Sequence, residues 1–290
     1  MISRLKVFFT ILIISIYIVF SFSNLDVILS ALLILSFGLI HGACDITLIT
    51  TKLRKSSFQI KSKIIFLYVL LAFISFFVVY KLPVIGFMIF LIISSYHFGE
   101  QHFHLKLKKS KLKFWHFLFY GLLIFMIMIE IHRNIVLEVL NTLLNYNIGN
   151  FPTQIILLVC IIINFILWMI DYNRLKLSVW KELFYLMLIS VLFYTTNLIV
   201  SFAAYFVIWH SIPSIFDQIN YLYKKVSIKT AFLYLKKSGI YWAVSISGLV
   251  FLVLYKEIMG DDFYRITYSF VVSVTIPHMF VINNILSESN

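Results

Sequence analysis

Residues 26–50 read DVILSALLILSFGLIHGACDITLIT, an apolar run that is long enough to cross a lipid bilayer as a helix yet carries His41 and Asp45. Ionisable side chains at such a depth are costly to bury, so a functional role is the default interpretation. In a continuous helix Asp45 lies one turn after His41 on the same face, and the small residues Gly42 and Ala43 leave room for a close neighbour. The stretch is typical of a buried metal ligand beside a carboxylate, and equally of a polar contact between packed helices.

The composition of the chain excludes an ordinary soluble domain. Hydrophobic residues make up 62% of the 290 residues and charged residues 12%, whereas soluble domains are about 25% charged. We expect a multi-pass protein of the cell membrane that is in contact with membrane lipid. The net charge of +12 does not indicate a nucleic-acid partner, because the basic residues fall between apolar runs, where they set the orientation in the membrane.

Apolar runs of about 17 to 25 residues predict membrane-spanning helices. The chain contains ten candidates: residues 5–22, 26–50, 64–80, 83–103, 114–131, 154–170, 183–198, 200–219, 240–255 and 265–286. With this layout the Lys and Arg residues divide 20 to 4 between the two sides, which predicts that both termini are cytoplasmic. The fold class predicted is an all-α, polytopic transmembrane helix bundle that forms a single integral membrane domain over residues 1–290.

One further segment differs from the spans. Residues 135–146 carry a polar stripe at helical spacing on an otherwise apolar sequence. This pattern predicts an amphipathic helix that lies in the outer membrane interface.

The histidines are the residues on which a chemical function could rest. Four of them, at the ends of predicted spans, are expected to be solvated: His102, His104, His116 and His132. The other four lie inside spans that run from outside to inside: His41, His97, His210 and His278. Counted from the predicted helix starts, these four differ in depth by less than roughly 8 Å. Four imidazoles at one level can converge on one metal ion, so we predict that they are metal ligands, with no catalytic side chain beyond them.

The type of ligand limits the metal and its surroundings. A set of neutral imidazoles suits iron, zinc or copper, and iron can open its coordination sphere to oxygen. Asp45 and Glu100 are placed to accept the second N–H of a ligating imidazole. Aromatic side chains near the histidines could line a slot for a flat polyene, although Phe and Tyr also fill helix cores: Tyr96, Phe98, Tyr205, Trp209 and Phe280.

Four short blocks carry a resemblance to a known family. They are His41-Gly42-Ala43-Cys44-Asp45, Tyr96-His97-Phe98-Gly99-Glu100, Trp209-His210-Ser211 and Pro277-His278. In type and order they resemble the motifs of the Brp/Blh-like β-carotene 15,15′-dioxygenases. The resemblance implies a membrane enzyme that uses histidine-bound Fe(2+) and O₂ to split the central double bond of β-carotene, a lipid-soluble polyene, into retinal. It also implies that His41, His97 and His210 are iron ligands.

The sequence departs from the family pattern in two places. The family has a second histidine four residues after that of the Trp-His-Ser block, where this chain has Ser214, and an acidic residue where this chain has His102. Three alternatives follow: His278 supplies a fourth ligand with Ser214 beside the site, the site has three histidines and more open positions, or the iron chemistry is lost or altered.

Two other function classes stay open from the sequence. One is another membrane metalloenzyme of the hydroxylase or desaturase kind, whose clustered histidine boxes the pair His102 and His104 does not match in spacing. The other is a non-enzymatic membrane protein that binds or transports a metal or lipid, for which broken paired helices and inverted repeats would be expected. No protein partner or oligomeric state is predicted.

Overall fold

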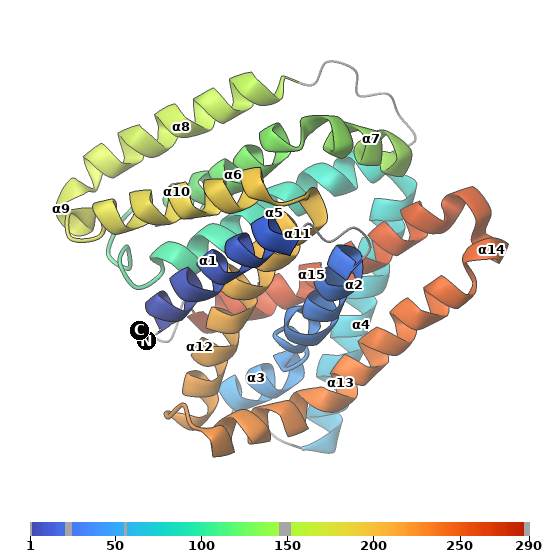
Figure 1. The fold of residues 1–290 in the computed structure, drawn as a ribbon. Coiled ribbons are helices and arrows are strands. Elements are labelled where there is room, and N and C mark those ends of the chain that lie inside the picture. The colour runs from blue at the N-terminus through green and yellow to red at the C-terminus, as the bar shows by residue number, and fades with distance from the viewer. Residues whose placement is uncertain (1, 21–24, 55–56, 145–151, 287–290) are drawn as a thin grey trace. The chain divides into compact units, whose positions relative to one another are not determined.

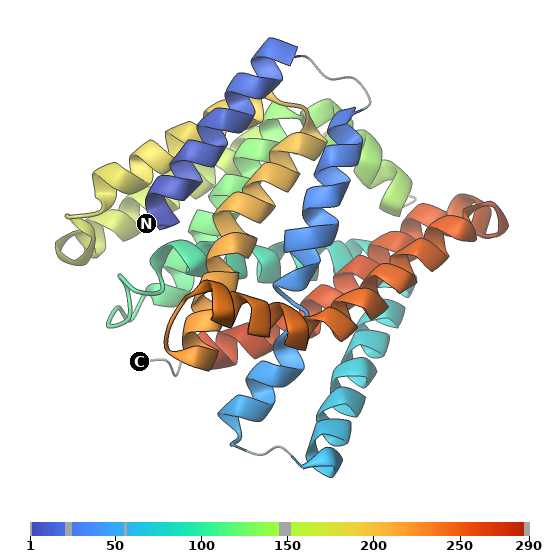
Figure 2. The same cartoon turned by 60° about the horizontal axis from the view of Figure 1, so that its bottom comes forward.

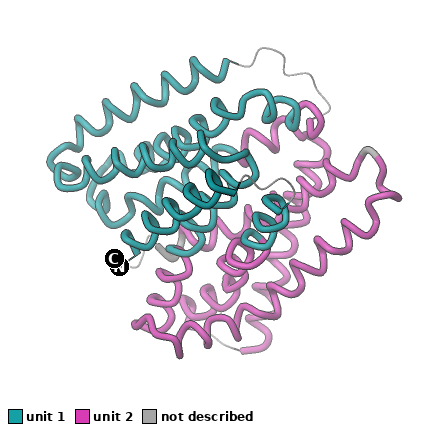
Figure 3. Tube along the Cα trace, in the orientation of Figure 1, with its two compact units in different colours: residues 1–34, 91–140, 147–213 teal, residues 35–90, 141–146, 214–290 magenta. Residues whose placement is uncertain are grey.

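The computed structural model describes residues 2–20, 25–54, 57–144 and 152–286. Within these ranges every regular element is a helix, so the predicted all-α class is confirmed. The chain divides into two compact units (Figure 3). Unit 1 comprises residues 1–34, 91–140 and 147–213, and unit 2 comprises residues 35–90, 141–146 and 214–290.

Eight described helices are long and apolar enough to cross a membrane. They are α1 (Ile2–Phe20), α4 (Phe58–Lys81), α5 (Pro83–Phe103), α6 (Lys113–Ile131), α8 (Thr153–Ile170), the continuous segment Leu198–Tyr223, α13 (Ile228–Leu254) and Phe263–Asn283 within α15 (Phe263–Leu286). A predicted seventh span corresponds to the shorter α10 (Val179–Thr195, 17 residues). The count of ten spans and the cytoplasmic termini stay predictions.

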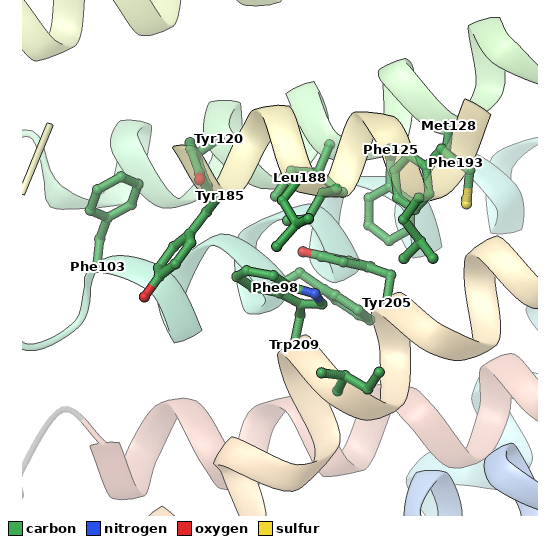
Figure 4. Packing of buried hydrophobic residues seen from close by; sticks show 14 of the residues in the cluster. Phe98, Phe103, Tyr120, Phe125, Met128, Tyr185, Leu188, Phe193, Tyr205 and Trp209 are labelled. Carbon is green, nitrogen blue, oxygen red and sulfur yellow. The ribbon is translucent and has the colours of Figure 1, made fainter. Parts of the chain in front are cut away.

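Unit 1 is built around helix α6. Helix α6 packs against α8 and α10, and α1 packs against α10 (Figure 1). Helix α11 (Leu198–Ala204) packs against α2 (Leu25–Leu33). Its core is aromatic: Figure 4 shows Phe98 beside Tyr205, whose rings stack with centroids 5.6 Å apart. Side chains from the second half of α5 and from α6 pack in this core. Their packing determines where His97, in the same half of α5, lies.

Glycines allow α5 and α6 to approach within backbone contact. A Cβ atom on Gly99 would lie 1.8 Å from the carbonyl oxygen of Phe117, and one on Gly121 would lie 1.8 Å from the carbonyl oxygen of Ser95. Small residues at a helix crossing are the usual means of close packing in membranes. Each glycine therefore lies against the backbone of the other helix, and together they set the distance between α5 and α6.

Unit 2 contains α3 (Asp45–Lys52), α4, most of α12 (Ile212–Tyr223), α13 and α15. Helix α15 packs along α4 and against α3 (Figure 2). At one end of this pair the guanidinium of Arg265 donates to the carbonyl oxygen of Tyr80 and lies 4.7 Å from the centroid of its ring. Helix α13 connects to α15 through α14 (Lys256–Met259) and the short 3₁₀-helix η3 (Gly260–Asp262).

The helix predicted for residues 26–50 is broken. After α2 the chain forms a π-helix, η1 (Ile34–Gly38), and residues 41–44 form a turn before α3 begins at Asp45. In this turn the N–H of Gly42 donates to Leu39 and that of Asp45 to Gly42, so the bonds span three residues where an α-helix spans four. The prediction of one continuous helix is wrong, because side chains from elsewhere bind the carbonyl groups that the turn exposes.

The predicted interfacial segment also forms a helix. Helix α7 covers Arg133–Leu144, while residues 145 and 146 lie outside the described ranges. Its position in the membrane interface stays a prediction.

Candidate metal centre

Unit 1 contains one pair of the histidines predicted to be ligands. His97 lies in α5 and His210 in the π-helix η2 (Tyr205–Ser211), and their ring centroids are 4.6 Å apart with the rings at 74°. Phe98 stacks on His210 at 4.3 Å, and the Glu100 carboxylate lies 3.9 Å from Nδ1 of His97. Short π-helical turns within α-helices are frequent at functional sites. This wider turn and the stacked phenylalanine fix the direction of the His210 ring.

Unit 2 contains the second pair. His41, in the turn before α3, and His278, in α15, have ring centroids 4.7 Å apart with the rings at 87°. Both side chains are buried, with exposed fractions of 5% and 4%. A Cβ atom added to Gly42 would contact Nδ1 of His278 at 3.5 Å, so His278 is the close neighbour for which the small residue leaves room. All four histidines predicted as ligands are therefore buried, and each is in edge-to-face contact with another of the set.

Asp45 has a different partner from the one that the sequence suggested. Its carboxylate lies 2.9 Å from Nδ1 of His278 and accepts a hydrogen bond of 2.9 Å from the Tyr68 hydroxyl, whereas Nδ1 of His41 contacts the carbonyl oxygen of Gly38. The break at residues 41–44 removes the helical face that His41 and Asp45 would share in a continuous helix, and the Asp45 carboxylate lies against His278. Asp45 is nevertheless a carboxylate that orients one of the predicted ligands.

These contacts give both histidines of unit 2 an oxygen acceptor at the same ring nitrogen, Nδ1. An oxygen acceptor beside Nδ1 assigns the ring proton to that nitrogen, so the lone pair is on Nε2. Metal-binding histidines usually have this arrangement, in which an oxygen acceptor fixes the tautomer through the ring nitrogen that does not bind the metal. The imidazoles of His41 and His278 therefore fit a divalent transition metal.

The predicted substrate-contacting aromatics fall into three groups. Tyr205 and Trp209 are each 1% exposed and pack inside the core of unit 1, where the Trp209 Nε1–H donates to the hydroxyl of Thr10. Tyr96 is half-buried next to the ring of Phe117, and Phe98 contacts His210 directly. Phe280 is 53% exposed. The contacts of Tyr205 and Trp209 are those of packing residues, whereas Phe98 lies beside a predicted ligand.

Ser214 is 3% exposed. Its hydroxyl oxygen accepts a hydrogen bond of 3.1 Å from the side-chain amide of Gln218, one turn later in α12. Ser214 thus belongs to a buried polar group of unit 2 that includes Gln218.

Two histidines that the sequence placed in solvent are buried. His102 contacts Glu182 at 3.2 Å and stacks on Trp209 with centroids 5.9 Å apart. Glu182 also accepts from Tyr120 and Lys106 and is 2% exposed. The prediction of a solvated His102 is wrong because a buried carboxylate gives its ring a partner. Sequence reasoning missed Glu182. The one feature that could have indicated it is the position of a carboxylate at the start of the apolar sequence of α10 (Val179–Thr195).

His116 is the second of these. Its Nε2 lies 3.0 Å from the carboxylate of Asp171, which also accepts from Ser110 and Arg174. Burial raises the pKa of the Asp171 carboxyl, but these three donors together hold it below its ordinary value. This cluster joins the start of α6 to the end of α8 and lies apart in sequence from the four histidine motifs.

Comparison with known proteins identifies the family. Residues 32–286, which include all four motif blocks, match the family model for β-carotene 15,15′-dioxygenase. A relative named β-carotene 15,15′-dioxygenase, from uncultured marine bacterium 66A03, is 28% identical over 262 residues, covering 87% of this chain and 90% of the relative. No solved structure matches the chain. The resemblance seen in the motifs is confirmed: the chain belongs to the β-carotene 15,15′-dioxygenase family.

Proposed function

We propose that this protein is an iron-dependent enzyme of the cell membrane that cleaves the central 15,15′ double bond of β-carotene. One O₂ molecule is consumed, and each of its oxygen atoms ends in one of two retinal molecules, so the reaction balances without a further reductant. The observation that carries the proposal is the set of four buried histidines, found as two edge-to-face pairs in the motif blocks of a dioxygenase family. Family membership disfavours the alternatives of a transporter or a hydroxylase.

In this proposal His41, His97, His210 and His278 together hold one Fe(2+). Support comes from the chemistry of the donors: all four are imidazoles, and two have Nδ1 directed at an oxygen acceptor, which leaves Nε2 as the ligand atom. Iron with open coordination positions supplies the redox chemistry that lets O₂ react with a polyene. With His278 as a ligand, the position of Ser214 does not need to supply one.

The substrate is proposed to reach the site from the bilayer, where a carotenoid dissolves. Phe98 is the best placed of the aromatic residues, because it contacts both His210 and Tyr205 and can offer a flat apolar wall beside the ligands. Asp45 orients the ring of His278, and the Glu100 carboxylate lies 3.9 Å from Nδ1 of His97. The role of the chain's own residues is thus to orient the imidazoles and to exclude water around an apolar substrate.

Production of the protein in bacterial cells that accumulate β-carotene tests this function. We expect the cells to lose their yellow colour and to contain retinal. The His97→Ala variant is expected to leave the colour unchanged at equal protein abundance. His104→Ala is the matched control, because His104 directly follows the end of α5 and lies outside the proposed ligand set. Retained colour in cells that contain folded wild-type protein would contradict the assignment of the substrate.

A further inference from the structure

The break at residues 41–44 leaves main-chain carbonyl groups without their helical donors. In an α-helix the N–H of Asp45 would donate to the carbonyl oxygen of His41, but here it donates to Gly42 at 3.4 Å. A buried carbonyl group with no donor is unfavourable, because it has lost its hydrogen bonds to water without replacing them. The turn that carries His41 therefore needs donors from another part of the chain.

Gln218 of α12 supplies such a donor, and the hydroxyl of Tyr234 of α13 lies beside the same carbonyl groups. The side-chain amide of Gln218 donates to the carbonyl oxygen of His41 at 2.8 Å. The hydroxyl of Tyr234 lies 3.2 Å from the carbonyl oxygen of Ile40 and 3.4 Å from that of His41. Gln218 is 4% exposed and Tyr234 is fully buried, so water does not replace them.

Both the NH₂ group and the carbonyl oxygen of the Gln218 side-chain amide form hydrogen bonds. One N–H donates to His41 and the other to the hydroxyl oxygen of Ser214, while its carbonyl oxygen accepts from Tyr234 at 2.9 Å. Tyr234 has a single hydroxyl proton, and its shortest contact is the one to Gln218. The tyrosine thus fixes which way the amide faces, and the amide then holds the carbonyl group of His41.

We propose that Gln218 and Tyr234 are positioning residues that hold the His41 turn open and so direct its imidazole toward the metal. The inference rests on the proposed function, because it takes His41 to be an iron ligand. If these donors are removed, the nearest way to satisfy the His41 carbonyl group is to close residues 41–45 into a regular helix. That closure would rotate the His41 ring and withdraw Asp45 from His278.

Metal titration of the full-length protein in detergent tests the proposal, with Fe(2+) affinity measured by chelator competition and the Co(2+) absorption spectrum as a report of ligand geometry. We expect Gln218→Met to weaken Fe(2+) binding by roughly 10- to 100-fold, the range typical of residues that orient metal ligands. The Co(2+) spectrum should change, and kcat should fall while KM for β-carotene stays the same. Tyr234→Phe should act in the same direction with a smaller effect.

The control variant is Ser238→Ala. Ser238 is buried one turn after Tyr234 in α13, and its hydroxyl donates within that helix, to the carbonyl oxygens of Tyr234 and Leu235. Its loss removes a buried hydroxyl group without touching the His41 turn. We expect Ser238→Ala to have wild-type metal affinity and an unchanged Co(2+) spectrum, even if its thermal stability differs slightly from that of the wild-type protein.

The outcomes separate this inference from the proposed function. If His41→Ala binds metal as the wild-type protein does, the proposed ligand set fails and the inference with it. If His41→Ala loses metal while Gln218→Met and Tyr234→Phe bind with wild-type affinity and spectrum, the positioning role is overturned and the function stands. Should Gln218→Met not fold, Tyr234→Phe, which removes one oxygen atom only, still decides the matter.

Discussion

Replacement of any one of His41, His97, His210 and His278 by alanine is expected to abolish retinal formation and to remove the iron from the purified protein. Each replacement deletes a proposed ligand from a site built of imidazoles alone, so no other donor of the set can compensate. The loss of affinity should exceed the roughly 10- to 100-fold that follows when only the partner of a ligand is removed. Iron content and retinal yield, measured on the same purified samples, check this result.

Asp45→Asn is expected to have an effect intermediate between the wild-type protein and the histidine variants. The amide keeps the shape of the carboxylate that contacts Nδ1 of His278 but carries no negative charge. We expect this variant to retain part of its iron and activity, between the wild-type protein and His278→Ala. Full iron occupancy in His278→Ala would contradict the four-histidine site and leave His41, His97 and His210 as the set.

Substitution of Gly99 by alanine is expected to destabilise the protein by about 3 kcal/mol or more, at the upper end of what overpacking costs. The added methyl group would lie 1.8 Å from the carbonyl oxygen of Phe117, and backbone atoms cannot rotate away as a side-chain tip can. Helices α5 and α6 must then separate, which displaces His97 two residues earlier. Thermal unfolding in detergent and the yield of folded protein measure the effect.

Gly239→Ala is the matched control for this prediction. Gly239 lies within helix α13, and a Cβ atom there would meet nothing within 4 Å. Because alanine favours helix over glycine by up to about 1 kcal/mol, we expect unchanged or slightly higher stability. Equal stability of the Gly99 and Gly239 variants would show that the close crossing of α5 and α6 is wrong.

Much of the helix layout is predictable from hydropathy. The predicted span 83–103 coincides with α5, and 154–170 differs from α8 by one residue, because apolar runs there end at charged residues or proline. Helix α13 begins at Ile228, well before its predicted start at residue 240, because a capping box of Ser227 and Thr230 starts it in a lysine-containing stretch. Hydropathy marks the apolar part of a helix and misses its polar turns.

The candidate site was predictable in its residue types but not in its contacts. The buried histidines follow from the cost of placing imidazoles in apolar spans. The turn at His41 does not, because it depends on Gln218, 177 residues later, and the partner of Asp45 is 233 residues away. The burial of His102 likewise depends on Glu182, which is 80 residues distant. Local patterns carry no information about such pairings, which arise only when the helices pack.

The most direct test of the central claim is the product stoichiometry of the purified protein. The protein is loaded with Fe(2+) in detergent, supplied with β-carotene and O₂, and the retinal formed is measured against the β-carotene consumed. We predict two molecules of retinal for each β-carotene, with none formed by iron-free protein. Cleavage products of unequal length, or no cleavage by iron-loaded, folded protein, would contradict central cleavage at a histidine-bound iron.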